Sequence, residues 1–207
     1  MASRTPSKVR LTLTVFLCTL LQATPVSADL WVIFPLRQEV MELSQWVPEA
    51  GDSLLVDRDS NIGYLLHANG GFTSFPVATG QRRIVRYIGR TYNATTPLAS
   101  WKAMSSEKKG DRITFGKSGR FLRLSMEDDT TFERTPYGIH SHAYIQTMLR
   151  EDDRYRSMGC ILVSEDVLDV IVETFEVNND TLNVKTAAGL GNESISYKFL
   201  REKMGML

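Results

Sequence analysis

Two short segments of this chain carry the residue types of a cysteine nucleophile and its base. One holds His140 and His142, and the other holds Ser157, Gly159 and Cys160. A thiol attacks a carbonyl as its thiolate, and a neighbouring imidazole can accept the proton. The pattern predicts Cys160 as the nucleophile, either histidine as the base, and Ser157 as the group that orients the imidazole. Gly159 allows a tight turn, so that backbone N–H groups can face an oxyanion.

The N-terminus has the features of an export signal. A basic head precedes an apolar run over residues 11–21, and small residues follow at 26–28. This pattern predicts a signal peptide over residues 1–28, cleaved after Ala28, with an uncleaved anchor as the alternative. Cys18 is a poor lipidation site, because a bulky leucine precedes it. We therefore expect a protein exported to the periplasm or the cell wall.

The mature chain would hold Cys160 as its one cysteine, so it could form no internal disulfide. A lone thiol in an oxidising compartment is prone to oxidation, which favours a functional role for Cys160. The alternative is that Cys160 is a small buried residue of the core. Cleavage removes three basic residues from a balance of 24 basic against 24 acidic ones. The near-neutral remainder gives no reason to expect binding to nucleic acid or membrane. We expect a monomer.

Most of the chain has β-strand patterning. Extended segments are predicted at residues 53–57, 62–68, 72–80, 82–92, 111–126 and 181–186, with turns at 69–71 and 117–119. A helix is predicted after Cys160, capped by Ser164, with apolar residues at helical spacing up to Phe175. We divide the rest into a lead-in over 29–50, a domain over 51–185, and a C-terminal extension over 186–207 whose sequence is compatible with a helix. His67 is expected at the surface.

The order of His140, 16 intervening residues and then Ser157-Met158-Gly159-Cys160 resembles the catalytic domain of L,D-transpeptidases, the YkuD-like family. Residues 53–80 resemble the opening hairpin of that family, and Thr96-Pro97 resembles its TP element. The resemblance covers residues 52–176 and implies a mainly β (α+β) fold, a β-sandwich with a helix after the cysteine.

The resemblance also implies a reaction. Cys160 would attack the bond between an L-centre and a D-amino acid in a peptidoglycan stem peptide, with His140 as the base. Ser157 would orient the imidazole, and the backbone around Gly159 and Cys160 would form the oxyanion hole. The resulting acyl-enzyme would pass to the amine of another stem or to water, and no metal or organic cofactor is implied. A zinc site at His140, His142 and Cys160 is disfavoured, because a closed site wants a fourth ligand.

Two positions depart from the family pattern, which has a histidine at Met158 and an arginine at Leu162. These losses put substrate orientation in doubt. His142 is a candidate auxiliary residue, because in an extended segment it would share a face with His140. Its spacing alone does not exclude it as the base, but the residue before His140 fits the family better.

Other functions compete with the transpeptidase. A hydrolytic L,D-carboxypeptidase of the same fold is favoured by the two departures. A catalytically silent wall-binding module is disfavoured by the joint presence of Cys160, His140 and Ser157. Papain-like and NlpC/P60-like peptidases are disfavoured because they place the cysteine before the histidine, the reverse of the order here.

Overall fold

The computed structural model of the protein describes residues 40–87, 89–127 and 132–206. The predicted signal peptide and the first half of the lead-in, residues 29–39, lie outside these residues. Within the described ranges, no helix is both long and apolar enough to cross a membrane.

The secondary structure is mainly β, as the sequence predicted. The strands are β1 (Ser53–Asp57), β2 (Ile62–Leu66), β3 (Phe72–Pro76), β4 (Thr79–Gly80), β5 (Ile84–Tyr87), β6 (Arg90–Asn93), β7 (Ser100–Lys108), β8 (Arg120–Glu127), β9 (Phe132–His140), β10 (Tyr155–Ser157), β11 (Ile161–Leu162) and β12 (Leu182–Ala187). The helices are α1 (Ile145–Arg150), α2 (Glu165–Val177) and α3 (Tyr197–Met204), with 3₁₀ turns η1 (Leu43–Gln45) and η2 (Leu190–Asn192).

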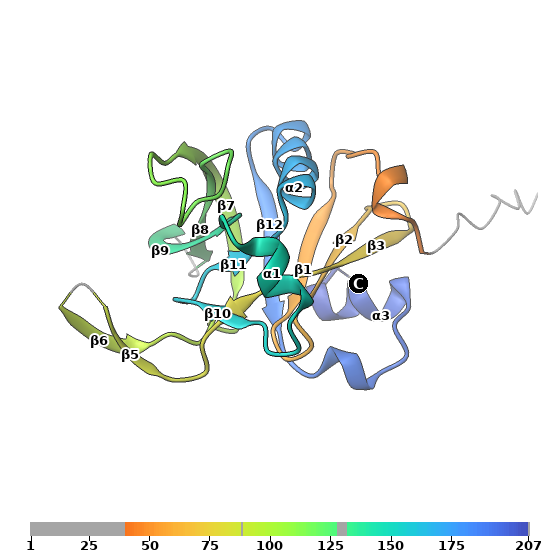
Figure 1. The fold of residues 1–207 in the computed structure, drawn as a ribbon. Helices are drawn as coiled ribbons and strands as arrows, with labels where there is room; N and C mark the ends of the chain where they lie inside the picture. The colour runs from red at the N-terminus through yellow and green to blue at the C-terminus, as the bar shows by residue number, and fades with distance from the viewer. Residues whose placement is uncertain (1–39, 88, 128–131, 207) are drawn as a thin grey trace, which may run out of the picture. The chain divides into compact units, whose positions relative to one another are not determined.

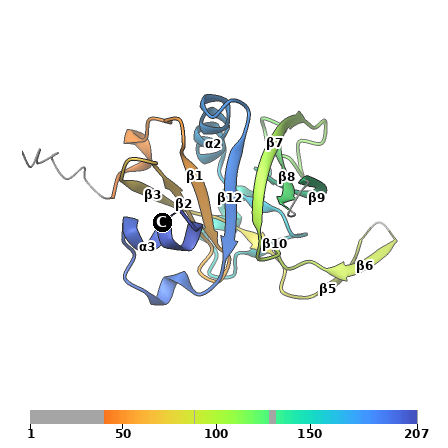
Figure 2. The ribbon, with the colours of Figure 1, turned by 180° about the vertical axis from the view of Figure 1, so that it is seen from behind.

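One curled sheet organises the domain (Figure 1). Its strand order is β11-β9-β8-β7-β12-β1-β2-β3, and smaller two-stranded sheets pair β10 with β4 and β5 with β6. Most neighbours in the large sheet are antiparallel, but β1 runs parallel to β12, and β11 runs parallel to β9. Figure 2 shows β12 between β1 and β7, in the middle of the sheet. The fold prediction, including a helix after Cys160, is confirmed.

The buried strand β1 contributes to two cores because its side chains alternate between the faces of the sheet. Leu54 and Val56 pack in the same core as residues of α2. Leu55 faces the other way and packs in a second core with Leu200 of α3. The sheet therefore has apolar packing on both faces at this point, and its position is fixed from two sides.

The helix α2 begins and ends where its sequence indicates. The Ser164 hydroxyl accepts a hydrogen bond from the Val167 N–H at 3.3 Å, which satisfies one of the unpaired amides at the helix start. The buried stripe includes Leu168, Ile171 and Phe175, as predicted. Packing of this stripe on the sheet fixes the segment that directly follows Cys160.

Some sequence predictions need correction. The segment predicted as one extended piece over residues 82–92 instead contributes two antiparallel strands, β5 and β6, and residues 111–116 form turns rather than strand. Strand β7 and helix α1 were not predicted. His67 is buried rather than exposed, because it pairs with Asp52 inside the protein. The turns at residues 69–71 and 117–119 are confirmed.

Candidate active site

The pairing of β9 with β11 brings His140 and Cys160 together from distant parts of the sequence. These strands run parallel, with Ile139 opposite Ile161 and His140 opposite Leu162. Cys160 directly precedes β11, so the same register puts it beside Gly138. Because side chains alternate along a strand, His140 and Cys160 face the same side of the sheet. Both residues line one cavity of about 1040 Å³.

His140 is a buried imidazole held in one orientation. Its Nδ1 lies 2.7 Å from the carbonyl oxygen of Ser141, which can only accept, so Nδ1 carries the proton. The rings of Phe115 and Phe121 lie 5.0 and 5.5 Å from the imidazole, measured between centroids. In this tautomer Nε2 is unprotonated when the ring is neutral. The arrangement therefore presents a base.

Burial keeps this base neutral. It lowers the pKa of His140 to about 4, although backbone hydrogen bonds to Ser141 and Thr114 favour the protonated ring. Burial also raises the pKa of the Cys160 thiol to about 11, against a backbone hydrogen bond from Gly138 and the charge of Arg123, which lower it. Both shifts favour a neutral thiol beside a neutral imidazole at pH 7. Proton transfer would then accompany nucleophilic attack rather than precede it.

Ser157 makes different contacts from the one predicted. Its hydroxyl donates to the Cys160 carbonyl at 2.5 Å and accepts from the Gly159 N–H at 3.0 Å. His140 is instead hydrogen-bonded to the main-chain carbonyl of Ser141, a contact that the sequence did not predict. A main-chain acceptor has no sequence signature, although its place directly after the histidine could have suggested it. Ser157 instead fixes the turn that carries the cysteine.

The predicted oxyanion hole involves the backbone of both Gly159 and Cys160, and the two amides differ. Gly159 has a φ of +114°, which suits glycine, and a Cβ there would lie 2.5 Å from a ring carbon of Tyr137. Its N–H is already bonded to Ser157, so it is not free to stabilise an oxyanion. Among the described residues the N–H of Cys160 itself has no hydrogen-bond partner. That N–H is the better candidate for the oxyanion donor.

A second glycine lets three backbone segments meet next to the cysteine turn. At Gly80 a Cβ would lie 2.0 Å from the carbonyl oxygen of Ala94 and 2.9 Å from the Cα of Gly159. The Gly80 N–H donates to the hydroxyl of Thr96 at 2.8 Å. Strand β4 thereby packs directly against the turn that precedes Cys160, which leaves no room for a side chain at Gly80.

Comparison with known proteins decides the family. Residues 51–182 match the family model of the YkuD L,D-transpeptidase catalytic domain, which is more than half of the chain. The chain belongs to this family. Members of the YkuD family act on peptidoglycan stem peptides. A search of curated proteins found no match.

Solved structures similar to this YkuD domain are distant in sequence. An L,D-transpeptidase from Xylanimonas cellulosilytica is 18% identical with a TM-score of 0.44, covering 67% of this chain and 61% of its own. Bd1075 of Bdellovibrio bacteriovorus is 11% identical with a TM-score of 0.47, covering 76% and 55%. The catalytic domain of the E. faecium L,D-transpeptidase is 15% identical with a TM-score of 0.39, covering 66% and 96%. This chain thus spans less than two thirds of the length of the first two.

The positions that depart from the YkuD pattern lie in the same cavity. Met158 is partly exposed there, and Leu162 is buried against Ala78 and Ile145. His142 also lines the cavity, and its Nδ1 accepts a hydrogen bond from the Tyr144 N–H at 3.1 Å. Neutral His142 therefore carries its proton on Nε2 and presents a donor, which is the reverse of His140.

Proposed function

We propose that this YkuD-family chain is a cysteine-dependent L,D-transpeptidase acting on peptidoglycan stem peptides. The observation that carries the proposal is the tautomer of His140. Its Nδ1–H is engaged by Ser141, so the lone pair of the neutral ring is on Nε2, and the ring lines the cavity that also contains the Cys160 thiol. A thiol and an oriented base on adjacent strands are what acyl transfer through sulfur requires.

The reaction follows from these groups. Nε2 of His140 takes the thiol proton as the Cys160 sulfur bonds to the carbonyl carbon between the L-centre and the D-amino acid. The negative oxygen that forms is stabilised by the N–H of Cys160. The carbon–nitrogen bond then breaks, the imidazolium gives its proton to the leaving amine, and a thioester remains. An acceptor amine or water then attacks the thioester carbonyl while His140 accepts its proton. The carbon–sulfur bond breaks, and the imidazolium gives that proton to the sulfur to restore the thiol.

The tautomers also support His140 over His142 as the base. His142 presents an Nε2–H donor, so it is suited to hold a substrate carbonyl and unsuited to receive a proton from Cys160. We propose this auxiliary part for His142 in place of the imidazole that the family carries at Met158. Normal turnover in a His142→Ala variant would contradict it.

The acceptor decides between two outcomes. Transfer to an amine makes a cross-link, and transfer to water makes an L,D-carboxypeptidase. Hydrolysis is the second candidate, because Met158 and Leu162 depart from the transpeptidase pattern of the family. We further propose that the protein is exported, because residues 1–28 have the composition of a signal peptide.

Mass spectrometry of the purified protein with a tetrapeptide stem tests the proposal, with Cys160→Ala as the matched control. A product that has lost its terminal D-amino acid, or a cross-linked dimer, should form with the wild type and be absent with the variant. Which product forms separates the carboxypeptidase from the transpeptidase. Folded protein that yields neither product nor thioester adduct from several stems would contradict the proposal and favour a silent wall-binding module.

A further inference from the structure

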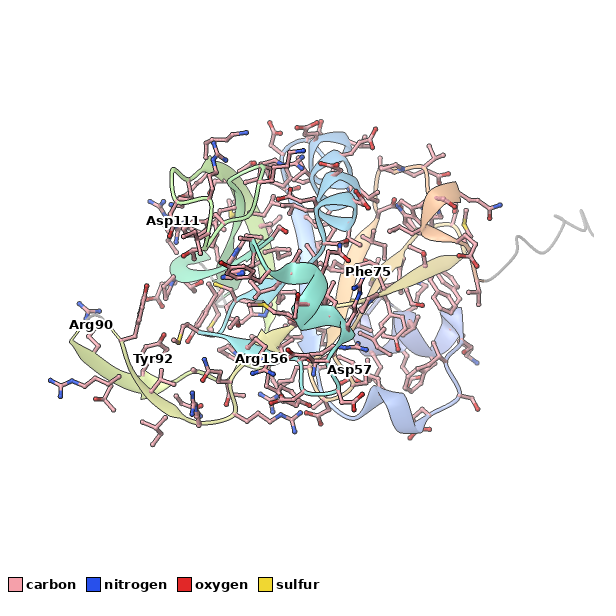
Figure 3. All side chains as sticks on the ribbon, viewed as in Figure 1. Asp57, Phe75, Arg90, Tyr92, Asp111 and Arg156 are labelled. Atoms are coloured by element: carbon pink, nitrogen blue, oxygen red, sulfur yellow. The ribbon has the colours of Figure 1, made fainter. Side chains whose placement is uncertain are left out.

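The cavity around Cys160 is cationic, although the whole chain has no net charge. Its lining includes Arg90, Lys109, Arg123 and Arg156. Asp and Glu are absent from the lining residues that the structure describes. In Figure 3, Arg90 and Tyr92 lie on the hairpin that extends from the side of the domain, whereas Arg156 lies nearer its centre. A pocket with this lining favours an anionic ligand.

Lys109 and Arg123 are held in place by the carboxylate of Glu107, which is not among the lining residues of the cavity. Glu107 accepts hydrogen bonds from Lys109 at 2.5 Å, from Arg123 at 2.5 and 3.0 Å, and from Arg134 at 2.8 Å. These bonds, that of Arg123 first, hold the pKa of Glu107 well below its usual range, so it stays ionised. Lys109 and Arg123, the two cations that line the cavity, outnumber the one carboxylate, so the cavity keeps an excess of positive charge.

Arg123 has hydrogen-bonding capacity left. A guanidinium carries five N–H donors, and the structure engages three of them, two with Glu107 and one with the Thr135 carbonyl at 2.7 Å. Bidentate pairing with Glu107 fixes the plane of the guanidinium, which reduces the entropy lost when a further acceptor binds. Arg123 can therefore hold a second carboxylate without giving up the first.

The cations lie next to the catalytic pair. The guanidinium carbon of Arg123 is 4.9 Å from the centroid of the Phe121 ring, and the Lys109 ammonium is 5.3 Å from it. The same ring contacts the His140 imidazole, with 5.5 Å between centroids. One aromatic side chain thus connects both cations with the base.

We propose that Arg123 and Lys109, held on Glu107, bind the carboxylate of the D-amino acid that leaves the donor stem peptide. The proposal rests on the proposed function and deepens it. The family pattern has an arginine at Leu162, and in this chain that position is buried and apolar. Arg123 of β8 and Lys109, which directly follows β7, supply positive charge to the same cavity.

The chemistry of the substrate identifies the carboxylate. In a stem that ends in the D-residue, only the amide nitrogen and one Cα separate this carboxylate from the carbonyl that Cys160 attacks. It must therefore lie near the sulfur when attack occurs, on the leaving-group side. Arg123 is close enough to the sulfur for its charge to favour the thiolate. A carboxylate in that position would meet the free edge of the guanidinium.

Calorimetric binding to the Cys160→Ala variant tests the inference, using a tetrapeptide stem and its C-terminal carboxamide. We expect the acid to bind about 10- to 100-fold more tightly than the amide, as charge-assisted hydrogen bonds allow. Adding Arg123→Gln or Lys109→Met should reduce this ratio to within about threefold, chiefly by weakening binding of the acid. Lys109→Met is the safer variant for folding, because Lys109 is more exposed than Arg123.

Arg134→Met is the matched control. Arg134 also bonds to Glu107, but its side chain is 70% exposed and is not among the lining residues of the cavity. It should leave the acid-to-amide ratio unchanged. Equal binding of acid and amide, or a ratio that survives both test variants, would overturn the inference. Turnover of the acid by the wild type is measured separately. If the acid is not turned over but still binds more tightly than the amide, the proposed function is refuted and the carboxylate site is retained.

Discussion

The protein contains two buried histidines that differ in what surrounds the second ring nitrogen. His67 and His140 are 1% and 4% exposed, and each has its Nδ1 fixed by one oxygen. His67 Nδ1 lies 2.8 Å from a carboxylate oxygen of Asp52, and the ring is stacked on Trp46 with 3.7 Å between centroids. His140 has a neutral carbonyl partner and lines the cavity that contains Cys160.

The difference separates a structural histidine from a catalytic candidate. The Nε2 atom of His67 is buried with no partner among the described residues, so no substrate can reach it. The carbonyl beside His140 fixes the tautomer without adding a negative charge, so the ring remains a neutral base. Burial of a histidine therefore does not identify an active site, whereas access to a nucleophile does.

The sharpest test of this comparison exchanges each histidine for alanine. His140→Ala should lower turnover by about 10³-fold, the usual contribution of a positioned base, in protein that still folds. His67→Ala should leave turnover per folded molecule within about threefold of wild type. It should instead lower the free energy of unfolding by about 3 kcal/mol, because the buried Asp52 carboxylate loses its ring partner and keeps only the hydrogen bond from the Glu49 N–H. Denaturant titration together with turnover distinguishes the two effects, and a joint loss of activity and stability in both variants would end the distinction.

Substitution of the aromatic residues that pack on the two histidines should have the next largest effect. Trp46→Ala should destabilise the protein by about 3 kcal/mol, since Trp46 is a core side chain and the stack on His67 is lost. Phe115→Ala should cost less, because Phe115 is half-buried. Its main effect should be an increase in the pKa of His140 as water enters, which NMR titration would detect. An unchanged His140 pKa in Phe115→Ala would show that burial by this ring is not what keeps the base neutral.

The sequence alone predicted the mainly β fold, the hairpin turn at residues 69–71 and helix α2, because each is specified by local patterning. It also selected His140 and Cys160, through spacing and the resemblance to a family. It missed His67 and Ser141 for physical reasons. The burial of His67 depends on Asp52 and Trp46, which reach it only through tertiary packing, and Ser141 acts through a main-chain carbonyl that every residue type carries. Contacts between distant or main-chain groups leave no pattern along the chain.

Acid should affect the two regions differently. The folded-state pKa of His140 is about 4 and the unfolded value about 6.5, so the folded state resists protonation. Its stability contribution is complete above about pH 6.5 and falls as the pH drops toward 4, by on the order of 3 kcal/mol. His140→Gln should lack this part of the acid sensitivity, whereas His67→Ala should retain it. Unfolding titrations at pH 7 and 4 measure the difference, and the kcat/KM of the wild type should decline only as the pH falls through about 4.

The smallest expected effect distinguishes main-chain from side-chain positioning of His140. Ser141→Ala keeps the carbonyl that accepts from Nδ1, and it removes a hydroxyl that is buried with no partner among the described residues. Turnover should therefore stay within about threefold of wild type, because the base keeps its tautomer. Ser157→Ala is the matched comparison, since it removes the two hydrogen bonds that fix the cysteine turn. That variant should cost about 1–3 kcal/mol in stability. Turnover lost in Ser141→Ala but kept in Ser157→Ala would mean that the Ser141 hydroxyl, rather than its carbonyl, positions the base.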